Sequence, residues 1–438
     1  MIIHIFPRQC CPQEGVLVQD SFARFDMLAV PKKQRLRPIA WAISYPDVWK
    51  HKAKIQKINM DGIQPPYILL CNHNAFLDFK VTTAAIFPHR ANYVVAIDGF
   101  TSPTKKGFAS REWLLRTVGC ICKRKFTNDA ILVRQLNRVA KNGDIAVLYP
   151  EARYSLCGTN AVLPESLGKL CKLLKVPVVS LIMHGHHVNA PVWNLVDRGV
   201  KPVESEMTCL FTADALAKAS AEEVNRAINT VFSYDDFAWQ RERDIRITYP
   251  KRAEGLHKVL YQCPHCKAEY QMDSSGKELF CKACGKHWEM DELGRLHAAS
   301  GETEFSHIPD WYEWERANVR REVESGRYSF SAPVRVMSLP NATGYIPIGE
   351  GTLTHNMDGF TVRGTGAYGE FEMEKPVPSL YSCHIELNYL GKYGDCVDLN
   401  TLDDTWYCYP YNCEFSVVKI ALATEELYQH HLRAKQKA

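Results

Sequence analysis

Between residues 66 and 183, short apolar runs alternate with helical patterns, and few folds accommodate this rhythm. The runs YILLC, NYVVAI, CICK, IAVLYP and VPVVSLIM have the length and composition of buried strands. The stretches between them, such as TNDAILVRQLNRVAKNG, show helical spacing with capping residues at the start and glycine at the end. This alternation predicts an α/β fold with a mostly parallel sheet flanked by helices.

Titratable and polar side chains follow four of these runs. In sheets of this kind ligands bind outside the carboxyl ends of the strands, so we expect these side chains to meet at one site. They are Asn72, His73 and Asp78 after YILLC, Lys123 and Arg124 in CICKR, Glu151 and Arg153 after IAVLYP, and His184, His186 and His187 after VPVVSLIM. We interpret the three-histidine cluster as structural, with phosphate or metal binding as the alternative.

His73 and Asp78 stand five positions apart, a spacing that separates two side chains on a continuous helix. A corner between a strand and a helix can bring them together, with His73 in the loop and Asp78 in the first helical turn. The carboxylate would then hold one ring nitrogen and leave the other free to take a proton. Such general-base assistance contributes roughly 10²–10⁴-fold in rate. The alternative is a loop histidine beside a helix-capping aspartate.

The motif NHNAFLD, followed further along the chain by YPEARYS, resembles the glycerolipid acyltransferase family over approximately residues 35–250. This family includes 1-acylglycerol-3-phosphate acyltransferases. The resemblance implies that His73 deprotonates an acceptor hydroxyl, that Asp78 orients His73, and that the hydroxyl attacks an acyl thioester directly. In keeping with this, the sequence contains no Gly-x-Ser-x-Gly nucleophile motif.

The resemblance also assigns substrate-binding residues. Lys123, Arg124 and Lys125 in GCICKRKF would hold the acceptor phosphate, and Asn72 and Glu151 would bind or position the acceptor. The match then departs from the family pattern. Arg153, also expected to bind the acceptor phosphate, stands two positions after the glutamate, where the family has arginine three positions after. In VPVVSLIMHGHH, which corresponds to a valine- and proline-rich block of the family, Pro177 matches, but Ser180 stands where a second proline is common. The identity of the acceptor is therefore left open.

The activity implied is transfer of a fatty acyl group from acyl-CoA or acyl carrier protein to the free hydroxyl of a lysoglycerophospholipid in phospholipid biosynthesis, with 1-acylglycerol-3-phosphate favoured. A non-catalytic lipid-binding adaptor is one alternative, and the intact His73 and Asp78 argue against it. A nucleic-acid binder is another, but 53 Lys and Arg against 49 Asp and Glu give a net charge of only +4. We therefore expect no nucleic-acid partner.

The first 60 residues favour contact with a membrane surface. Trp41, Tyr45 and Trp49 are spaced four residues apart and would form one aromatic stripe if Pro46 permits a helix. The alternative is that this stripe packs on the domain itself. No apolar stretch of eighteen residues and no signal-like start occur, so we expect a cytoplasmic protein, peripheral on the inner face of the membrane. The flanking basic residues are Lys32, Lys33, Arg35, Arg37, Lys50, Lys52, Lys54 and Lys57.

Four cysteines in two Cys-x2-Cys pairs predict a zinc ribbon over residues 257–298. Four thiolates close the tetrahedral coordination of zinc, so one structural zinc ion is expected, with iron as the alternative. The mixed charge of the ribbon favours a structural or protein-docking role. The predicted ligands are Cys263, Cys266, Cys281 and Cys284.

The length of 438 residues suggests about three domains. We expect an N-terminal region at 1–60, an acyltransferase domain at 61–250, the ribbon at 257–298, a helical connector at 303–326 and a β-rich domain at 330–438. The last region has seven short strand patterns and a final helical pattern, an order that looks pleckstrin-homology-like. A scaffold or a dimer contact is the alternative role for it.

Overall fold

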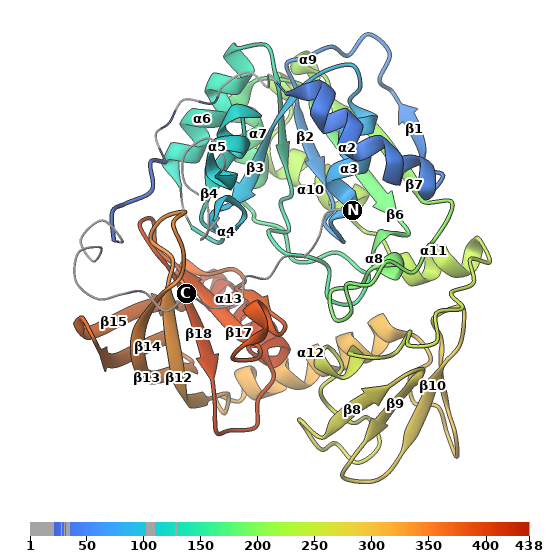
Figure 1. Ribbon diagram of the computed structural model, residues 1–438, viewed down its shortest axis with the longest axis vertical. Helices are drawn as coiled ribbons and strands as arrows, with labels where there is room; N and C mark the ends of the chain where they lie inside the picture. The colour runs from blue at the N-terminus through green and yellow to red at the C-terminus, as the bar shows by residue number, and fades with distance from the viewer. Residues whose placement is uncertain are drawn as a thin grey trace.

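The computed structural model describes residues 22–27, 29, 31, 36–101, 110–127 and 129–437, and these residues form three β-sheets with flanking helices (Figure 1). Three of the basic residues near the N-terminus, Lys32, Lys33 and Arg35, lie outside the described residues. No helix in the described ranges is long and apolar enough to cross a bilayer.

The first sheet is mostly parallel, as predicted. Neighbouring pairs among β6, β2, β5, β3 and β4 run parallel, whereas β7 is antiparallel to β6 and β1 is parallel to β7. The predicted runs form β2 to β6, but the sequence analysis did not predict β1 or β7. In spatial order the strands are β1 (Lys54–Ile58), β7 (Glu204–Phe211), β6 (Val178–His184), β2 (Ile68–Cys71), β5 (Ile145–Leu148), β3 (Ala91–Ala96) and β4 (Ile121–Lys123).

Both faces of this sheet are buried, which explains why its central strands are apolar without alternation. In β2, Leu69 and Cys71 belong to one hydrophobic core and Ile68 and Leu70 to another. The first core includes residues of α3, and the second includes residues of α6, α7 and α10. The helices are α3 (Leu77–Ala85), α6 (Ala130–Lys141), α7 (Leu167–Leu174) and α10 (Ala221–Val231).

Further helices complete this part of the chain, and α6 shows how such a helix begins and ends. Asp129 caps α6 by accepting hydrogen bonds from the backbone N–H groups of Ile131 and Leu132. Gly143 follows the helix with a φ of +74°, in the left-handed region that favours glycine. The others are α2 (Arg37–Lys50), α4 (Ile97–Phe100), α5 (Arg111–Thr117), α8 (His186–Asn189), α9 (Ala213–Lys218) and α11 (Asp236–Glu242).

The cysteine-bearing segment forms a small antiparallel sheet in the order β11-β10-β9-β8. A short 3₁₀ helix, η2 (Leu256–Lys258), leads into it, and α12 (Ile308–Glu324) follows it at the position predicted for the helical connector. The strands are β8 (Met272–Ser275), β9 (Glu278–Cys281), β10 (His287–Met290) and β11 (Leu296–Ala298).

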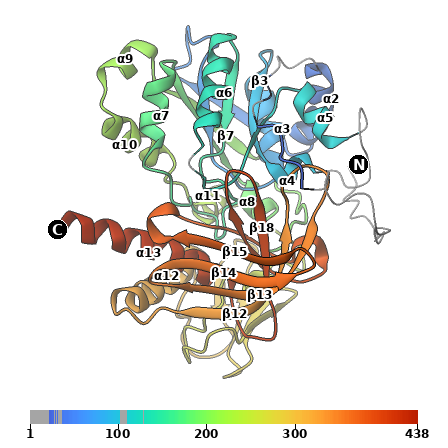
Figure 2. The same ribbon diagram turned by 90° about the vertical axis from the view of Figure 1, so that its left-hand side faces the viewer.

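The C-terminal region forms an antiparallel sheet in the order β15-β14-β13-β12-β18-β17-β16, followed by α13 (Val417–Lys437). The predicted strands and final helix are confirmed. Figure 2 shows this sheet below the α/β region, with the end of α13 projecting from the body. The strands are β12 (Phe330–Ser338), β13 (Ile346–Asn356), β14 (Gly359–Gly366), β15 (Gly369–Pro376), β16 (His384–Glu386), β17 (Cys396–Asn400) and β18 (Thr405–Pro410), with 3₁₀ turns η3 (Val377–Ser379) and η4 (Tyr389–Gly391).

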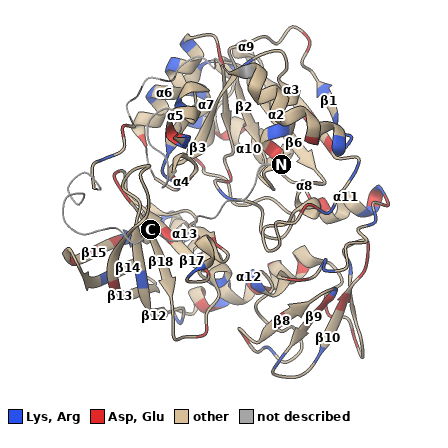
Figure 3. Ribbon diagram, in the orientation of Figure 1, with Lys and Arg blue, Asp and Glu red and all other residues tan. Residues whose placement is uncertain are grey.

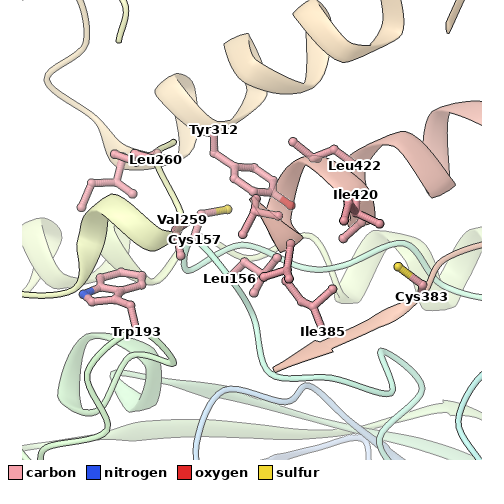
Figure 4. Close-up of a cluster of buried hydrophobic side chains, with 14 of the residues drawn as sticks. Leu156, Cys157, Trp193, Val259, Leu260, Tyr312, Cys383, Ile385, Ile420 and Leu422 are labelled. Atoms are coloured by element: carbon pink, nitrogen blue, oxygen red, sulfur yellow. The ribbon is translucent and has the colours of Figure 1, made fainter. Parts of the chain in front are cut away.

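One continuous core joins the three regions. The loop after β5 contributes Leu156, the segment entering the ribbon contributes Leu260, α12 contributes Tyr312 and α13 contributes Leu422, all in the same cluster (Figure 4). The loop after β5 carries predicted site residues. The C-terminal regions therefore help to fix the position of that loop.

Candidate active site

The structure brings His73 and Asp78 together at the corner between β2 and α3. The Nδ1 atom of His73 lies 2.9 Å from Oδ2 of Asp78. A hydrogen bond in which Nδ1–H donates to the carboxylate leaves Nε2 as the free acceptor. The His73 side chain is 25% exposed and lines a cleft, whereas the Asp78 side chain is fully buried. This arrangement matches a general base with an orienting partner.

The backbone of the loop holds Asp78 in place. Its Oδ2 also accepts the N–H groups of Asn74 at 2.6 Å and Ala75 at 3.0 Å. Burial alone would raise the pKa of this carboxyl, but the hydrogen bonds from His186 and His73 outweigh it and lower the pKa to about 2. Asp78 is therefore ionised at neutral pH.

His186 was expected at this edge of the sheet as part of a structural histidine cluster, and the structure places it in direct contact with Asp78. Its Nδ1 lies 2.6 Å from Oδ1 of Asp78, and its ring is fully buried. Asp78 thus joins a histidine from the end of β2 to one at the start of α8, after β6. The signal in the sequence was the HGHH cluster, but nothing in its spacing singles out the second histidine.

Glu151 connects the end of β5 to the same corner. Its Oε1 accepts the backbone N–H of His73 at 3.0 Å, and its Oε2 accepts that of Ala161 at 2.8 Å. Burial raises the pKa of this carboxyl to about 8, against the lowering effect of the two N–H donors. Glu151 touches the backbone of His73, so in this structure it helps to fix the position of His73.

Asn72 fastens β2 to β6. Its Nδ2 donates to the carbonyl of Met183 at 2.9 Å, and its Oδ1 accepts the N–H of Met183 at 2.8 Å. The side chain is buried, and these two bonds occupy both ends of its amide. The structure therefore places Asn72 behind the cleft, where it supports the loop that carries His73.

A cleft with a volume of about 2520 Å³ opens beside His73. The imidazole packs between the rings of Tyr149 and Tyr154, each with its centroid 4.4 Å away. Exposed apolar side chains from five elements or loops also line the cleft, giving it a partly apolar wall. They are Ile43, Phe76, Trp113, Leu114, Leu173 and Leu195.

The two arginines predicted to hold phosphate lie at the interface with the C-terminal β domain. The Arg124 guanidinium donates to the carbonyls of Leu339 (2.9 Å), Pro340 (2.7 Å) and Asp403 (2.9 Å) and to the hydroxyl of Thr405 (2.7 Å). This side chain is 1% exposed. These contacts use Arg124 as a link between domains.

Arg153 makes a similar contact with the final helix. Its Nη2 donates to Oε1 of Glu425 at 2.7 Å, and both side chains are almost fully buried. Burial would lower the pKa of Arg153, but the Glu425 carboxylate outweighs it and raises that pKa. Ala152, which precedes Arg153, has a φ of +58° in the left-handed region. The irregular PEARYS block thus turns its arginine toward α13.

Lys125 lies inside a cluster of acids instead of facing an open phosphate site. Its Nζ is 3.5 Å from Asp98, 3.7 Å from Glu386 and 3.6 Å from Asp398. His384, Glu386 and Asp398 are close enough together to hold a metal ion, but this ammonium lies only 3.1 Å from Nε2 of His384. A cation is therefore already present among them.

Lys123 is the remaining residue of the predicted basic block. Its Nζ donates to the carbonyl of Thr127 at 3.2 Å, and burial lowers its pKa. It lines the cleft on the side of β4. Figure 3 shows the Lys and Arg residues of the described segments spread over several elements.

The other two histidines of the HGHH cluster pack against tryptophan rings. His184 stacks on Trp239 with ring centroids 6.0 Å apart, and burial lowers its pKa to about 4. His187 packs edge-on against Trp193 and is fully buried, with its pKa lowered to about 3 by burial. Both rings are therefore neutral packing groups at pH 7.

The four ribbon cysteines lie close enough together to bind zinc. The Sγ atoms of Cys263 and Cys284 are 3.8 Å apart, and those of Cys266 and Cys281 are 3.7 Å apart. Tetrahedral zinc with bonds of about 2.3 Å to sulfur requires sulfur–sulfur separations of about 3.8 Å. The donor set therefore fits structural zinc, with all four positions filled by protein.

The aromatic stripe lies on a helix, as predicted. Trp41 packs edge-on against Phe87 with centroids 4.8 Å apart, and Tyr45 contacts the same ring at 6.1 Å. Trp49 is 70% exposed. Two members of the stripe therefore pack at least partly on the domain, while the third faces solvent.

No protein-family model matches the chain, and no curated protein matches its sequence. Among solved structures, it is similar to the 1-acyl-sn-glycerophosphate (LPA) acyltransferase PlsC from Thermotoga maritima. The sequence identity is 13% and the TM-score is 0.36, over 45% of this chain and 76% of that chain. A likeness at this level establishes neither the family nor the activity of this chain.

Proposed function

We propose that this chain is an O-acyltransferase that moves a fatty acyl group from a thioester to the free hydroxyl of a lysoglycerolipid. The observation that carries the proposal is the exposed edge of His73 in an apolar-walled cleft, with buried Asp78 behind it. A carboxylate that fixes the proton on Nδ1 leaves Nε2 poised as a base.

In the proposed reaction, His73 takes the proton of the acceptor hydroxyl at Nε2. The oxygen attacks the thioester carbonyl and forms the ester bond as the carbon–sulfur bond breaks. The proton then passes to the departing thiolate, so an ester and a thiol are formed. Asp78 stabilises the imidazolium that exists between these steps. Glu151 and His186 hold the corner in shape.

Acyl chains and lipid acceptors need an apolar approach, and the exposed residues of the cleft wall supply one. We propose peripheral contact with a membrane surface through this face and α2, with acyl-CoA or acyl carrier protein as donor. The ribbon and the C-terminal domain, whose strand order suits a pleckstrin-homology-like fold, would support the catalytic region.

The sequence-based preference for 1-acylglycerol-3-phosphate as the acceptor assumed that basic residues in GCICKRKF and YPEARYS bind its phosphate. Arg124 and Arg153 are engaged at the domain interface, so both guanidinium groups that this preference assumed are already paired with protein groups. The headgroup is therefore a separate question from the reaction.

The test is direct. Purified protein is incubated with acyl-CoA or acyl carrier protein thioesters and a panel of lysolipids, and acylated products are identified by mass spectrometry. We expect product from wild type and a loss of at least about 100-fold in His73→Ala.

The matched control is His297→Ala, because His297 forms a histidine–aspartate pair with Asp291 at 2.9 Å on the ribbon, outside the cleft. It should keep full activity. Acylation that survives in His73→Ala would refute the proposal, as would absence of product with every pair of donor and acceptor.

A further inference from the structure

The two oxygens of the Asp78 carboxylate contact two different histidines. Oδ2 lies 2.9 Å from Nδ1 of His73, the proposed base, and Oδ1 lies 2.6 Å from Nδ1 of His186. His73 follows β2 and His186 begins α8, after β6, so one buried carboxylate joins the ends of two neighbouring strands. Within the described ranges, no group other than His186 makes a hydrogen bond to Oδ1. A change at His186 therefore reaches His73 through one shared group.

The ring of His186 makes a single polar contact. The side chain is fully buried, and its Nε2 atom has no hydrogen-bond partner among the described residues. A buried polar atom without a partner costs stability, so an apolar side chain of similar size would fill this space at a lower cost. Packing alone gives no reason for a histidine here, whereas the contact with Asp78 does.

A donor on the second oxygen changes what the carboxylate does to the base. An aspartate beside a histidine favours the protonated imidazolium, because opposite charges attract. A hydrogen bond from His186 stabilises the same negative charge and weakens its attraction for a proton on His73. The pKa of Asp78 agrees with this, since burial would raise it, but the hydrogen bonds from His186 and His73 lower it to about 2. A positive charge on His186 would act on His73 in the same direction.

We propose that His186 is a positioning residue that holds the second oxygen of Asp78 and thereby lowers the pH at which His73 takes up a proton. A general base works best when its basicity is matched to the operating pH, so this adjustment increases the fraction of His73 that can accept the hydroxyl proton. The inference rests on the proposed acyl transfer, because it concerns the base of that reaction. It gives a function to a histidine that the sequence analysis interpreted as structural.

Other titratable groups also surround Asp78 and His186. Those that interact with the charge of Asp78 or His186 are Glu151 after β5, His184 of β6, His187 of α8 and Asp236 of α11. Three hydroxyls and one thiol complete the surroundings, and burial raises their pKa values; they belong to Tyr149, Tyr154, Tyr234 and Cys71. All of these groups are retained when only His186 is replaced. A difference between His186 variants therefore reports on His186 itself.

The experiment follows the protonation of His73 directly, by NMR of the full chain with isotope-labelled histidine. The chain contains 16 histidines, and the signal of His73 is identified by its absence from His73→Ala. His186→Phe keeps a ring of similar shape but offers no donor to Asp78. We expect the titration midpoint of His73 to lie at least about half a pH unit higher in His186→Phe than in wild type.

His186→Asn is the matched variant, because its amide N–H can take the place of the ring N–H and donate to the same oxygen. Its His73 midpoint should match wild type. His187→Leu controls for the loss of a buried histidine, since neither ring nitrogen of His187 makes a hydrogen bond to a described residue. It should also match wild type. An unchanged or lower midpoint in His186→Phe overturns the inference, as do equal shifts in His186→Phe and His186→Asn. His186→Leu, which also lacks the donor, takes the place of His186→Phe if that variant does not fold.

The NMR titration needs no substrate, so it separates this inference from the proposed function. If wild type acylates an acceptor, the acidic limb of kcat/KM against pH should move upward in His186→Phe with the His73 midpoint and stay in place in His186→Asn. If no acceptor is acylated, the proposed function fails, while the titration still decides whether His186 acts on His73. A loss of kcat in His186→Phe at every pH, with an unmoved acidic limb, is the result of a merely structural role and overturns the inference.

Discussion

The Asp78 carboxylate contacts both His73 and His186, so its replacement should disturb both contacts. In Asp78→Asn the single amide oxygen cannot accept from His73, His186, Asn74 and Ala75 together, and the amide N–H₂ would face at least one of these donors. We expect kcat to fall by roughly 10²–10⁴-fold in the acylation assay. Asp291→Asn, in the histidine–aspartate pair of the ribbon, should leave kcat unchanged; a loss below tenfold in Asp78→Asn would contradict the role given to Asp78.

The same residue predicts a pH dependence of stability. The pKa of Asp78 is lowered from 3.8 to about 2 in the folded state, so its stabilisation is complete above pH 5 and is lost as pH falls through about 4 toward 2. A shift of this size corresponds to about 2 kcal/mol. Urea unfolding of wild type and Asp78→Asn at pH 6, 5, 4 and 3 should show a free-energy difference that shrinks only below pH 5. A constant difference would contradict the lowered pKa.

At the scale of residues, the sequence predicted contacts between side chains that are close together along the chain. His73 and Asp78 are five positions apart, and the strand that precedes His73 and the helix that contains Asp78 are visible in the local pattern. The partners of Arg124 and Arg153 could not be predicted, because they lie more than 200 positions away along the chain. A buried arginine and a phosphate-binding arginine look identical in one sequence.

The ribbon gives the clearest prediction at the scale of elements. We expect one zinc per chain by elemental analysis, and its removal from Cys263→Ser/Cys266→Ser protein. The ribbon also anchors α12, since the backbone N–H of Gln262 donates to Glu315 at 2.8 Å and the indole of Trp311 donates to Gln262 O at 3.0 Å. Loss of zinc should therefore lower the melting temperature as well. Cys413→Ser, at an exposed cysteine outside the ribbon, is the control, and metal retained without Cys263 and Cys266 would refute the site.

The aromatic residues of α2 have two different environments, because Trp49 faces solvent and Trp41 packs on the domain. Mutations can therefore separate membrane contact from stability. Trp49 is 70% exposed, so Trp49→Ala should weaken flotation with anionic liposomes and leave the melting temperature unchanged. Trp41 packs on Phe87, so Trp41→Ala should lower both the melting temperature and the free energy of unfolding. We expect the free energy of unfolding to fall by about 1–3 kcal/mol, the usual cost of truncating a partly buried aromatic side chain. Equal flotation of Trp49→Ala and wild type would remove this helix from the membrane-contact proposal.

Helices and strands were predicted correctly where their own residue composition is distinctive. The apolar runs of β2 and β5 are buried on both faces, so their hydrophobicity is continuous and easily recognised. Strand β7 was missed because polar residues alternate along ESEMTCLF, and β1 because KIQKI is short and half exposed. Strand β1 at the edge of the sheet and β7 next to it are less buried than the central strands, so their hydrophobic signal is weaker.

At the scale of the whole molecule, the composition predicted separate modules, whereas the structure joins them through one hydrophobic core and several buried polar links. Composition reports what a segment contains but not which surfaces of other segments cover it. The buried pairs Arg153–Glu425 and Arg316–Glu425 connect the loop after β5, α12 and α13. A loop that carries the site is therefore held by the two C-terminal helices.

Replacement of Arg124 tests whether the α/β region and the C-terminal β domain unfold cooperatively. Its guanidinium satisfies three backbone carbonyls and the Thr405 hydroxyl of the β domain, so Arg124→Met would leave these buried acceptors without a donor while filling a similar volume. Leaving such groups unsatisfied should destabilise the protein by on the order of 3 kcal/mol. In differential scanning calorimetry we expect wild type to unfold in one main transition and Arg124→Met to show an earlier, separate transition of the β domain. Arg134→Met, on the exposed face of α6, removes the same group without touching the interface and should unfold like wild type. A single transition at the wild-type temperature in Arg124→Met would mean that the shared core alone unites the domains.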